Sequence, residues 1–204
     1  MIAVIDYGMG NLRSVHKALT RLGAQAEIVQ QPDELPHADK LILPGVGAFA
    51  DAIARLRELR LDEAIREFVA GGRPLLGICL GMQMLFDVSY EDGEHKGLGI
   101  LRGKVVKFGS QGDVMPPRIP HMGWNSLRWQ RSGELLHGLE KECFAYFAHS
   151  YHVVPADIQD ICTTTEYGYV FASSVQRGNV FATQFHPEKS QSIGLKLLAN
   201  FIRL

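Results

Sequence analysis

The segment Gly77-Ile78-Cys79-Leu80-Gly81 constrains the fold of this chain more than any other segment, because it places one reactive side chain between two glycines. The apolar run Pro74-Leu75-Leu76 precedes it, so we expect a strand that ends at Cys79 and a helix that follows. So sharp a turn brings neighbouring Cβ atoms too close, and glycine lacks that atom. A lone free cysteine is most often a small buried hydrophobe. The paired glycines instead predict a nucleophile elbow, in which the amino-terminal end of the helix favours the thiolate.

Size and composition are those of a globular protein with one core. The chain has 204 residues, of which 46% are hydrophobic and 21% are charged, so we expect a single domain over residues 1–204. The net charge of −1 argues against a nucleic-acid partner. No apolar segment is long enough for a bilayer, and Met1–Asp6 is typical of a first strand, not of a signal peptide. We therefore expect no membrane association.

The three cysteines, Cys79, Cys143 and Cys162, are far apart in the sequence. An odd number with no C-x-x-C pair argues against a disulfide framework and against a zinc site. This pattern favours the reducing cytoplasm. Cys143 and Cys162 lie in apolar, strand-like contexts, and we expect both to be buried.

Strands alternate with helices in the first half of the chain, which predicts a parallel sheet with helices on both faces. We expect one helix from Leu12, stopped at Gly23, and a second helical stretch from about Ala48 to Ala70 with a break near Leu59. The expected strands are 2–6, 26–29, 41–43 and 74–78. The fold class is therefore α/β, with three layers and a largely parallel mixed sheet flanked by helices.

The second half is richer in strands. Residues 87–125 contain many glycines and prolines and lack helical periodicity, and Gly178-Asn179 predicts a hairpin turn. We expect Ser190 to cap a final helix with one apolar face. The expected strands are 103–108, 126–129, 144–148, 170–175 and 180–185, and the apolar face of the helix consists of Ile193, Leu197, Leu198, Phe201 and Ile202.

A cysteine nucleophile needs a base and a group that orients the base, and Gln184-Phe185-His186-Pro187-Glu188 offers both. In an extended segment, His186 and Glu188 share a face, and Pro187 disfavours a helix between them. The imidazole can carry the cysteine proton to a leaving amine, and the carboxylate can orient the imidazole. A histidine and a glutamate spaced in this way usually form an ordinary polar pair, and the upstream elbow favours the catalytic interpretation.

Pro44-Gly45-Val46-Gly47 follows the strand 41–43, and its glycines can expose backbone N–H groups to an anion. We interpret it as an oxyanion hole, although glycine turns after strands are common. Gly8 and Gly10 resemble half of a dinucleotide-binding motif, but Arg13 occupies the place of its third glycine. We therefore expect no nucleotide there.

Together, the elbow extended to Gln83 and the segment Gln184–Glu188 resemble the two signature blocks of the class I glutamine amidotransferases. The resemblance spans essentially the whole chain and implies a flavodoxin-like fold without a cofactor or a metal. It implies that Cys79 attacks the side-chain amide of glutamine, giving a γ-glutamyl thioester and ammonia, while His186 transfers protons and Glu188 orients it. The implied oxyanion hole is Gly45, Val46, Gly47 and Leu80, and the implied substrate-binding residues are Gln83, His149, Ser150 and Tyr151.

Within this family the chain resembles the glutaminase subunits of imidazole glycerol phosphate synthases. The segments that carry this narrower resemblance are 6–15, 44–49, 120–125 and 184–190. Val46 stands where many relatives have a glycine, which implies an oxyanion strand that rearranges when a partner binds. His152 departs from the subfamily pattern after the Ser-Tyr pair, which affects only the detail of the glutamine contacts.

The resemblance also implies a partner, because a chain of this size has no room for a second site that consumes ammonia. That partner would be a cyclase subunit of the (β/α)8-barrel type, which forms imidazole glycerol phosphate and the purine-pathway carboxamide AICAR in histidine biosynthesis. The implied interface residues are Asn11, Met122, Trp124 and Lys189. Met122 and Trp124 would otherwise be ordinary core residues, but the nearby Pro116, Pro117 and Pro120 predict an irregular loop.

Three alternatives stay open at this stage. The chain could serve another synthase, such as that for anthranilate, aminodeoxychorismate or pyridoxal phosphate. It could be an unrelated cysteine–histidine hydrolase that acts alone on peptides or esters. It could also be an inactive scaffold, although all three triad residues are present. Recovery of the bound synthase and a glutaminase assay with and without it distinguish these possibilities.

Overall fold

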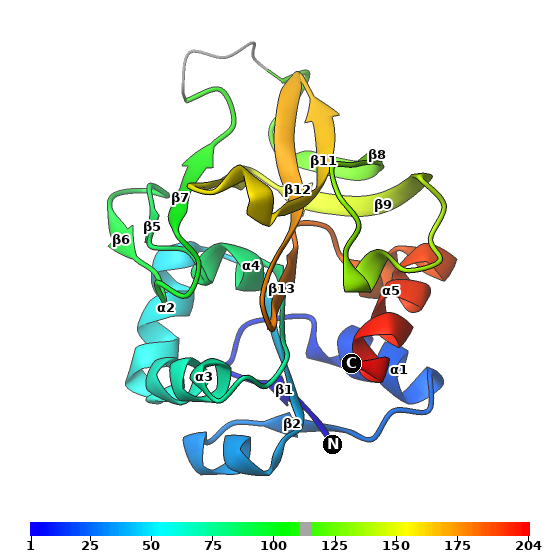
Figure 1. Ribbon diagram of the computed structural model, residues 1–204. Helices are drawn as coiled ribbons and strands as arrows, with labels where there is room; N and C mark the ends of the chain where they lie inside the picture. The colour runs from blue at the N-terminus through cyan, green and yellow to red at the C-terminus, as the bar shows by residue number, and fades with distance from the viewer. Residues whose placement is uncertain (111–115) are drawn as a thin grey trace.

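The computed structural model describes residues 1–110 and 116–204, which form two sheets with helices around the larger one (Figure 1). Among these residues the larger sheet has nine strands in the order β2-β1-β3-β4-β13-β12-β11-β8-β9. Strands β2, β1, β3, β4 and β13 are mutually parallel, and their order is that of a flavodoxin-like sheet. Their bounds are β1 Ile2–Ile5, β2 Ala26–Val29, β3 Lys40–Gly45, β4 Leu75–Cys79 and β13 Val180–Thr183.

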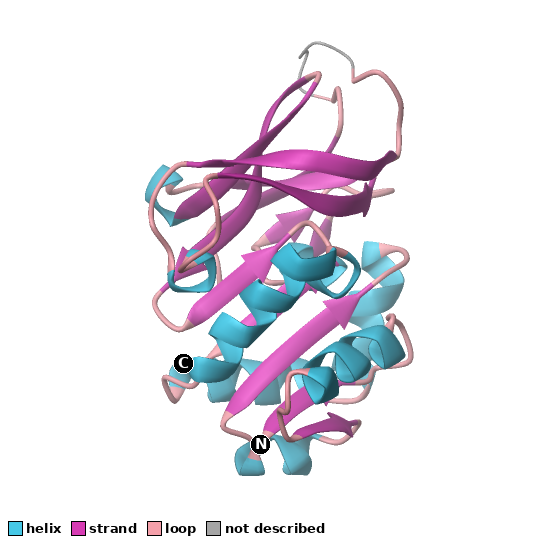
Figure 2. Cartoon of the chain, turned by 90° about the vertical axis from the view of Figure 1, so that its right-hand side faces the viewer, coloured by secondary structure: helices cyan, strands magenta, loops and turns pink. Residues whose placement is uncertain are grey.

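The remaining four strands of this sheet are antiparallel, and they extend it away from the helices (Figure 2). These are β8 His121–Trp129, β9 Glu142–His149, β11 Ile161–Tyr167 and β12 Tyr169–Arg177. A smaller sheet has the order β10-β7-β5-β6. Its strands are β5 Val88–Ser89, β6 His95–Lys96, β7 Gly103–Lys107 and β10 Tyr151–Pro155. The α/β class with a mixed, largely parallel sheet is confirmed.

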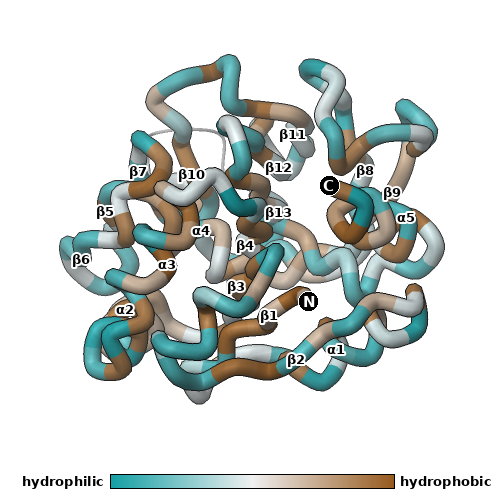
Figure 3. The backbone as a smooth tube through the Cα atoms, turned by 60° about the horizontal axis from the view of Figure 1, so that its bottom comes forward, coloured by the Kyte–Doolittle hydropathy of each residue, from teal (hydrophilic) through white to brown (hydrophobic). Residues whose placement is uncertain are grey.

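Helices cover both faces of the parallel strands and give the molecule three layers (Figure 1). Successive side chains of β1 point to opposite faces of the sheet, and the core is divided in the same way. Ala3 and Ile5 pack in the cluster that includes α2, α3 and α4. Ile2 and Val4 pack in the cluster that includes α1 and α5. The hydropathy of the chain follows this arrangement, with β1 strongly apolar and the helices alternating (Figure 3). The helices are α1 Leu12–Arg21, α2 Phe49–Glu58, α3 Leu61–Ala70, α4 Leu80–Met84 and α5 Gln191–Arg203, with short 3-10 turns η1 Pro32–His37, η2 Glu134–Leu136, η3 Ile158–Asp160 and η4 Pro187–Lys189. Within the two described ranges, no helix combines the length and apolar character needed to span a bilayer.

The structure bears out the expected break in the long helical stretch. Arg60, directly after Leu59, has φ of 58°, a left-handed conformation that ends α2 and allows α3 to start in a new direction. The hairpin at Gly178-Asn179 joins β12 to the antiparallel β13, and Cys143 and Cys162 are buried, as expected.

Three local expectations are wrong. Met122 and Trp124 lie on strand β8 and not in an irregular loop, because pairing of β8 with β9 satisfies their backbone groups despite the upstream prolines. Pro187–Lys189 forms a 3-10 turn and not an extended segment, since proline is favoured at the first position of a helical turn. The Ser190 side chain does not cap α5, because its hydroxyl donates to the carbonyl oxygen of His186 at 2.6 Å.

Gly81 is the position at which an added methyl group is expected to be most harmful. An ideal Cβ there would lie 1.8 Å from the carbonyl oxygen of Leu43, so β3 or the elbow would have to move. We expect Gly81→Ala to reduce the free energy of unfolding by ~3 kcal/mol and the melting temperature by roughly 10 °C. Calorimetry of the two proteins measures this loss. Gly71→Ala is the matched control, because its Cβ would meet nothing closer than 3.4 Å. Equal melting temperatures for the two variants would contradict the close approach at the elbow.

Candidate active site

The elbow holds Cys79 at the carboxyl end of β4, in a conformation that residues other than glycine rarely adopt. Its φ of 56° and ψ of −111° mark the sharp turn between β4 and α4. Gly77 is required nearby, because a Cβ there would lie 2.9 Å from Leu85 Cδ1 and 3.0 Å from the Met82 nitrogen. The Cys79 side chain is nearly buried, and the adjacent helix α4 is only five residues long. The strained backbone conformation thus directs the Cys79 sulfur atom into the site.

His186 and Glu188 follow β13, the strand that pairs with β4 in parallel, and this adjacency brings them to Cys79. The His186 Nδ1–H group donates to Glu188 Oε1 at 2.8 Å, and both side chains are buried. The His186 backbone is fixed as well, because its N–H donates to the Tyr146 carbonyl oxygen at 2.9 Å. A histidine held in this way has a fixed ring orientation, and its other nitrogen, Nε2, is the one that can transfer a proton.

The charge state of His186 depends on its two partners. Burial by itself would lower its pKa, but hydrogen bonds and charge interactions with Cys79 and Glu188 outweigh burial and raise the pKa from 6.5 to about 10. The site therefore favours the imidazolium form of His186 at neutral pH. The stability from this pairing is fully present below pH 6.5 and is lost as the pH rises through about 10.

Removing the thiol should lower the pKa of His186. In Cys79→Ala the imidazolium loses one of the two partners that raise its pKa, while the opposing effect of burial remains. We expect the histidine to titrate at a lower pH than in the parent protein, and the associated stability to be lost at a correspondingly lower pH. An NMR titration of ring-labelled histidine measures this shift. An unchanged His186 pKa would mean that the sulfur and the ring do not interact.

A pocket of about 260 Å³ opens directly over Cys79. It brings together most of the residues that the sequence singled out for the oxyanion hole and for substrate, namely Val46, Gly47, Leu80, Gln83, His149, Ser150 and Tyr151. Gly45 does not line the pocket but pairs in register with Cys79, and a Cβ there would lie 2.6 Å from the Tyr7 hydroxyl oxygen. Its role in the structure is to let β3 pack tightly beside the elbow.

Sequence reasoning missed several residues of this pocket. Glu91, Pro120 and Ala148 also line it, and Gln184 lies behind it with its side-chain nitrogen 3.8 Å from the Cys79 sulfur. Glu91 accepts the Phe49 N–H at the start of α2 at 2.8 Å, and burial raises its pKa. Glu91 follows β5 in a segment without periodicity, so only the three-dimensional structure places it in the same pocket as Cys79.

Gln83 is held by a network of hydrogen bonds. Its side-chain nitrogen donates to the Tyr151 carbonyl oxygen at 2.9 Å and to Gln184 Oε1 at 3.1 Å. Both amide hydrogens are therefore used, and the Gln83 amide oxygen is left to accept a hydrogen bond from a ligand. The Tyr7 hydroxyl donates to the Pro44 carbonyl oxygen at 3.0 Å and so fixes the start of the candidate oxyanion segment.

Of the candidate interface residues, Met122 lines this pocket and Lys189 lines another. Met122 and Trp124 are 65% and 47% exposed, so the alternative that they are core residues is wrong. Trp124 pairs with Tyr146 across β8 and β9, and Lys189 Nζ lies 5.9 Å from the Tyr146 ring centre. Asn11 precedes α1, which packs against η4. In the part of the chain that the structure describes, no cluster of three or more His, Cys, Asp or Glu side chains could hold a metal ion.

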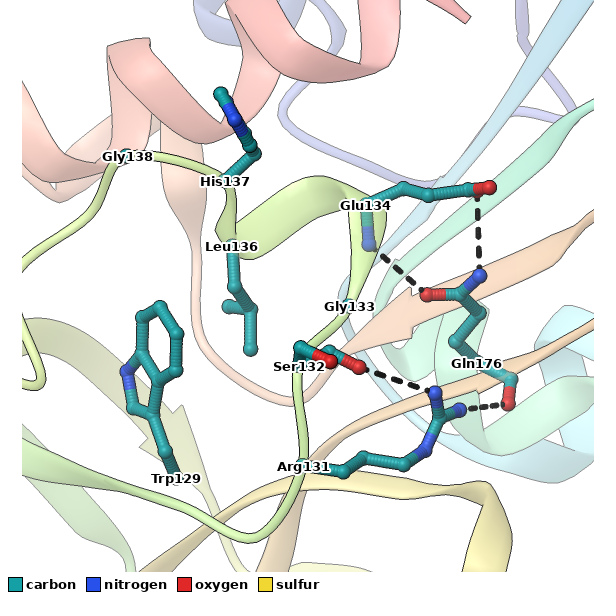
Figure 4. A pocket seen from close by; sticks show the side chains of 9 residues that line it. All are labelled: Trp129, Arg131, Ser132, Gly133, Glu134, Leu136, His137, Gly138 and Gln176. Carbon is teal, nitrogen blue, oxygen red and sulfur yellow. Dashed lines mark hydrogen bonds between the residues drawn. The ribbon is translucent and has the colours of Figure 1, made fainter.

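A larger pocket of about 450 Å³ lies elsewhere, between β8, η2 and β12 (Figure 4). Several of its polar groups are used by contacts within the wall, although, among the described residues, Trp129 Nε1 and Arg131 Nε are buried without a hydrogen-bond partner. Arg131 donates to the carbonyl oxygens of Gln176 and Ser132, and the Gln176 side chain pairs with Glu134. None of its lining residues is a cysteine. This pocket is the larger of the two, but the smaller pocket contains the nucleophile Cys79 and is therefore our candidate active site.

Comparisons with known proteins show the family to which the fold and sequence of this chain correspond. The family described as glutamine amidotransferase class-I matches residues 3–204. The chain is similar to the imidazole glycerol phosphate synthase subunit HisH of Aquifex aeolicus, with 53% identity over 201 residues that cover 98% of this chain and 95% of the relative. It is equally similar, at 53% over 203 residues, to HisH of Geobacillus thermodenitrificans, with 99% and 95% coverage. Among solved structures, PurLQS from Thermotoga maritima has the same fold, with a TM-score of 0.78, 22% identity and coverage of 99% and 97%.

Proposed function

This chain belongs to the class I glutamine amidotransferases, and we propose that it is the glutaminase subunit of an imidazole glycerol phosphate synthase, built as one domain over residues 1–204. It would hydrolyse glutamine to glutamate and pass the ammonia to a separate cyclase subunit, in the cytoplasm, for histidine biosynthesis. The observation that carries the proposal is the position of Cys79, on a strained elbow beside the buried His186–Glu188 pair and at the floor of a pocket.

The reaction follows from this arrangement. The Cys79 thiolate attacks the side-chain carbonyl carbon of glutamine, and the oxyanion that forms accepts hydrogen bonds from backbone N–H groups of Leu80 and of the segment 45–47. The imidazolium of His186 gives its Nε2 proton to the amide nitrogen, which leaves as ammonia and creates the γ-glutamyl thioester. His186 then takes a proton from water, the hydroxide attacks the thioester, and glutamate leaves as the thiolate is restored. Glu188 keeps the imidazole in the required tautomer throughout.

Glu91 is proposed to bind the α-ammonium group of glutamine. Its carboxylate lines the pocket, and one oxygen is fixed by the Phe49 N–H. We expect Glu91→Gln to raise KM for glutamine by roughly tenfold with little change in kcat, because the lost contact is equally strong in substrate and transition state. Steady-state glutaminase kinetics with the partner present measure both constants. Asp92→Asn is the control, since this neighbouring carboxylate is not among the residues that line the pocket. A change in kcat alone for Glu91→Gln would contradict the assignment.

The exposed apolar face on β8 and β9 supports a protein partner. Met122, Trp124 and Phe144 are all exposed on this face. A group of large apolar side chains in contact with water is unusual for a monomeric protein. We propose that a (β/α)8-barrel cyclase covers it, with contacts from Asn11, Met122, Trp124 and Lys189. Val46 in the oxyanion segment is 39% exposed and lines the same pocket as Met122, which supports activation by a partner bound at this face.

The test compares glutamate release by the purified chain alone, with the barrel cyclase, and with the cyclase and its aminated ribulosyl-phosphate ligand. We expect slow hydrolysis by the chain alone and a large increase in the full complex. Stimulation by the synthase for anthranilate or pyridoxal phosphate, and not by the cyclase, would overturn the assignment of partner. Full activity of the isolated chain on peptides or esters would overturn the assignment of reaction.

A further inference from the structure

A line of hydrogen bonds leads from the wall of the glutamine pocket into the sheet. His149 Nδ1 lies 2.8 Å from the Tyr151 carbonyl oxygen, and His149 Nε2 lies 2.9 Å from His121 Nδ1. His121 Nε2 in turn lies 3.2 Å from the Asn125 side-chain nitrogen. Of these residues His149 and Tyr151 line the pocket, whereas His121 is buried behind it on β8. His121 has no part in the mechanism derived above.

The donor and acceptor of each hydrogen bond in this line follow from the group at its end, the Tyr151 carbonyl oxygen. The Tyr151 carbonyl can only accept, so His149 Nδ1 carries a hydrogen and donates. In a neutral ring His149 Nε2 then has a lone pair, so the hydrogen between the two rings belongs to His121 Nδ1. His121 Nε2 must therefore accept, and the Asn125 amide nitrogen, which also donates to the Glu166 carbonyl at 2.9 Å, supplies the donor. All contacts are satisfied only when both rings are neutral and both carry their hydrogen on Nδ1.

The surroundings favour the neutral rings that this assignment needs. Burial lowers the pKa of His121 to about 4. Burial also lowers the pKa of His149 well below its usual value, and the nearby His121, His152 and His186 rings lower it further, although its hydrogen bond to Tyr151 opposes this shift. The His121 ring stacks between Phe147 and Tyr167, with ring centres 4.6 Å and 4.0 Å away. This stacking fixes the plane of the His121 ring and hence the direction of its Nδ1–H bond.

We propose that His121 is a positioning residue, which selects the Nδ1-protonated tautomer of His149 and thereby holds the Tyr151 carbonyl in place beneath Gln83. In the other tautomer, a lone pair on His149 Nδ1 would face the lone pairs of the Tyr151 carbonyl oxygen, and the two atoms would repel each other. Gln83 donates to that same carbonyl oxygen at 2.9 Å, so its displacement would move the amide that contacts the substrate. The inference rests on the proposed function in one respect, that glutamine binds in this pocket.

Two variants of His121 distinguish the effect of its hydrogen bond to His149 from the effect of its aromatic stacking. His121→Phe keeps a ring between Phe147 and Tyr167 but removes the donor to His149. His121→Asn removes the ring but supplies an amide nitrogen one bond from Cγ, where the Nδ1 atom stood. If His121 serves only to fill the core, the asparagine variant is the more impaired of the two. If it positions His149, the phenylalanine variant is the more impaired in substrate binding, and asparagine restores the function despite lower stability.

The experiment records the ¹⁵N shifts of the His149 ring, the melting temperature, and kcat and KM for glutamine with the cyclase bound. We expect His121→Phe to mix the two His149 tautomers and to raise KM about fivefold to tenfold, the equivalent of one neutral hydrogen bond, with a smaller change in kcat. We expect His121→Asn to keep the Nδ1-protonated tautomer and a KM near that of the parent.

An unchanged tautomer or an unchanged KM in His121→Phe would overturn the inference, and so would a higher KM in His121→Asn than in His121→Phe. Failure of the proposed function gives a different result. If the parent complex hydrolyses no glutamine, the assignment of activity is wrong, while the ring shifts of His149 still decide whether His121 sets its tautomer.

Discussion

Replacing Cys79 with alanine is expected to abolish glutamine-dependent synthesis by the complex and to leave synthesis from added ammonium salts at the parental rate. The sulfur is the nucleophile that attacks glutamine in the proposed reaction, so the glutamine-dependent rate should fall by a factor on the order of 10³ or more. In the proposed complex, the cyclase would accept free ammonia in its own site, which this substitution does not touch. Alanine also keeps a Cβ at a residue with φ of 56°, so the substitution adds no backbone strain at the elbow.

The measurement is product formation by the complex with glutamine and, separately, with ammonium ions. Cys143→Ala and Cys162→Ala are the matched controls, since both residues are buried cysteines that lie outside the pocket. They should lose some stability but keep both activities. Glutamine-dependent synthesis by Cys79→Ala would contradict the thioester, and loss of the ammonium-dependent reaction would contradict the independence of the cyclase site from Cys79.

His186→Ala is the second substitution with a large expected effect, and its effect is compared with that of Glu188→Gln. Loss of the imidazole removes both proton transfers and should lower kcat by a factor on the order of 10⁴. Glu188→Gln should be about a hundredfold less severe, as is usual when the orienting acid and not the base is changed. The glutamine oxygen can still accept the Nδ1–H group, but it no longer supplies the charge that stabilises the imidazolium.

Pre-steady-state measurement of ammonia release and of glutamate release separates the two steps that His186 serves. Glu166→Gln is a suitable control, because this surface carboxylate pairs with Arg128 at 2.7 Å and is half exposed. Equal effects of His186→Ala and Glu188→Gln, or a larger effect of the latter, would contradict the assigned roles.

Local patterns in the sequence were sufficient for the parallel half of the fold. The apolar runs before Gly45 and Cys79 predict β3 and β4, and the glycines after them predict the sharp turns. The sequence also predicts a helical stretch from about Ala48 to Ala70 with a break near Leu59, where α2 gives way to α3. Each of these features depends on neighbours in the sequence, so the chain itself contains the information.

The parts that sequence reasoning missed depend on long-range contacts. β8 is a strand because β9 pairs with it, and the prolines before it conceal that pairing. Glu91 reaches the pocket through its hydrogen bond to Phe49, which is 42 residues away in the sequence. The His121–His149 contact likewise joins residues 28 positions apart. No local pattern marks such contacts, because a buried histidine in a strand has the same sequence signature whether or not it positions another residue.

The most direct test of the central claim, that Cys79 is the residue acylated by glutamine, is labelling with a diazoketone analogue of glutamine. The thiolate displaces nitrogen from the protonated diazo carbon of the bound analogue and forms a stable thioether. With the cyclase bound, we expect one label per chain on Cys79, in proportion to the loss of glutaminase activity and slowed by added glutamine. Inactivation with the label on Cys143 or Cys162, or inactivation without a label on Cys79, would contradict the account.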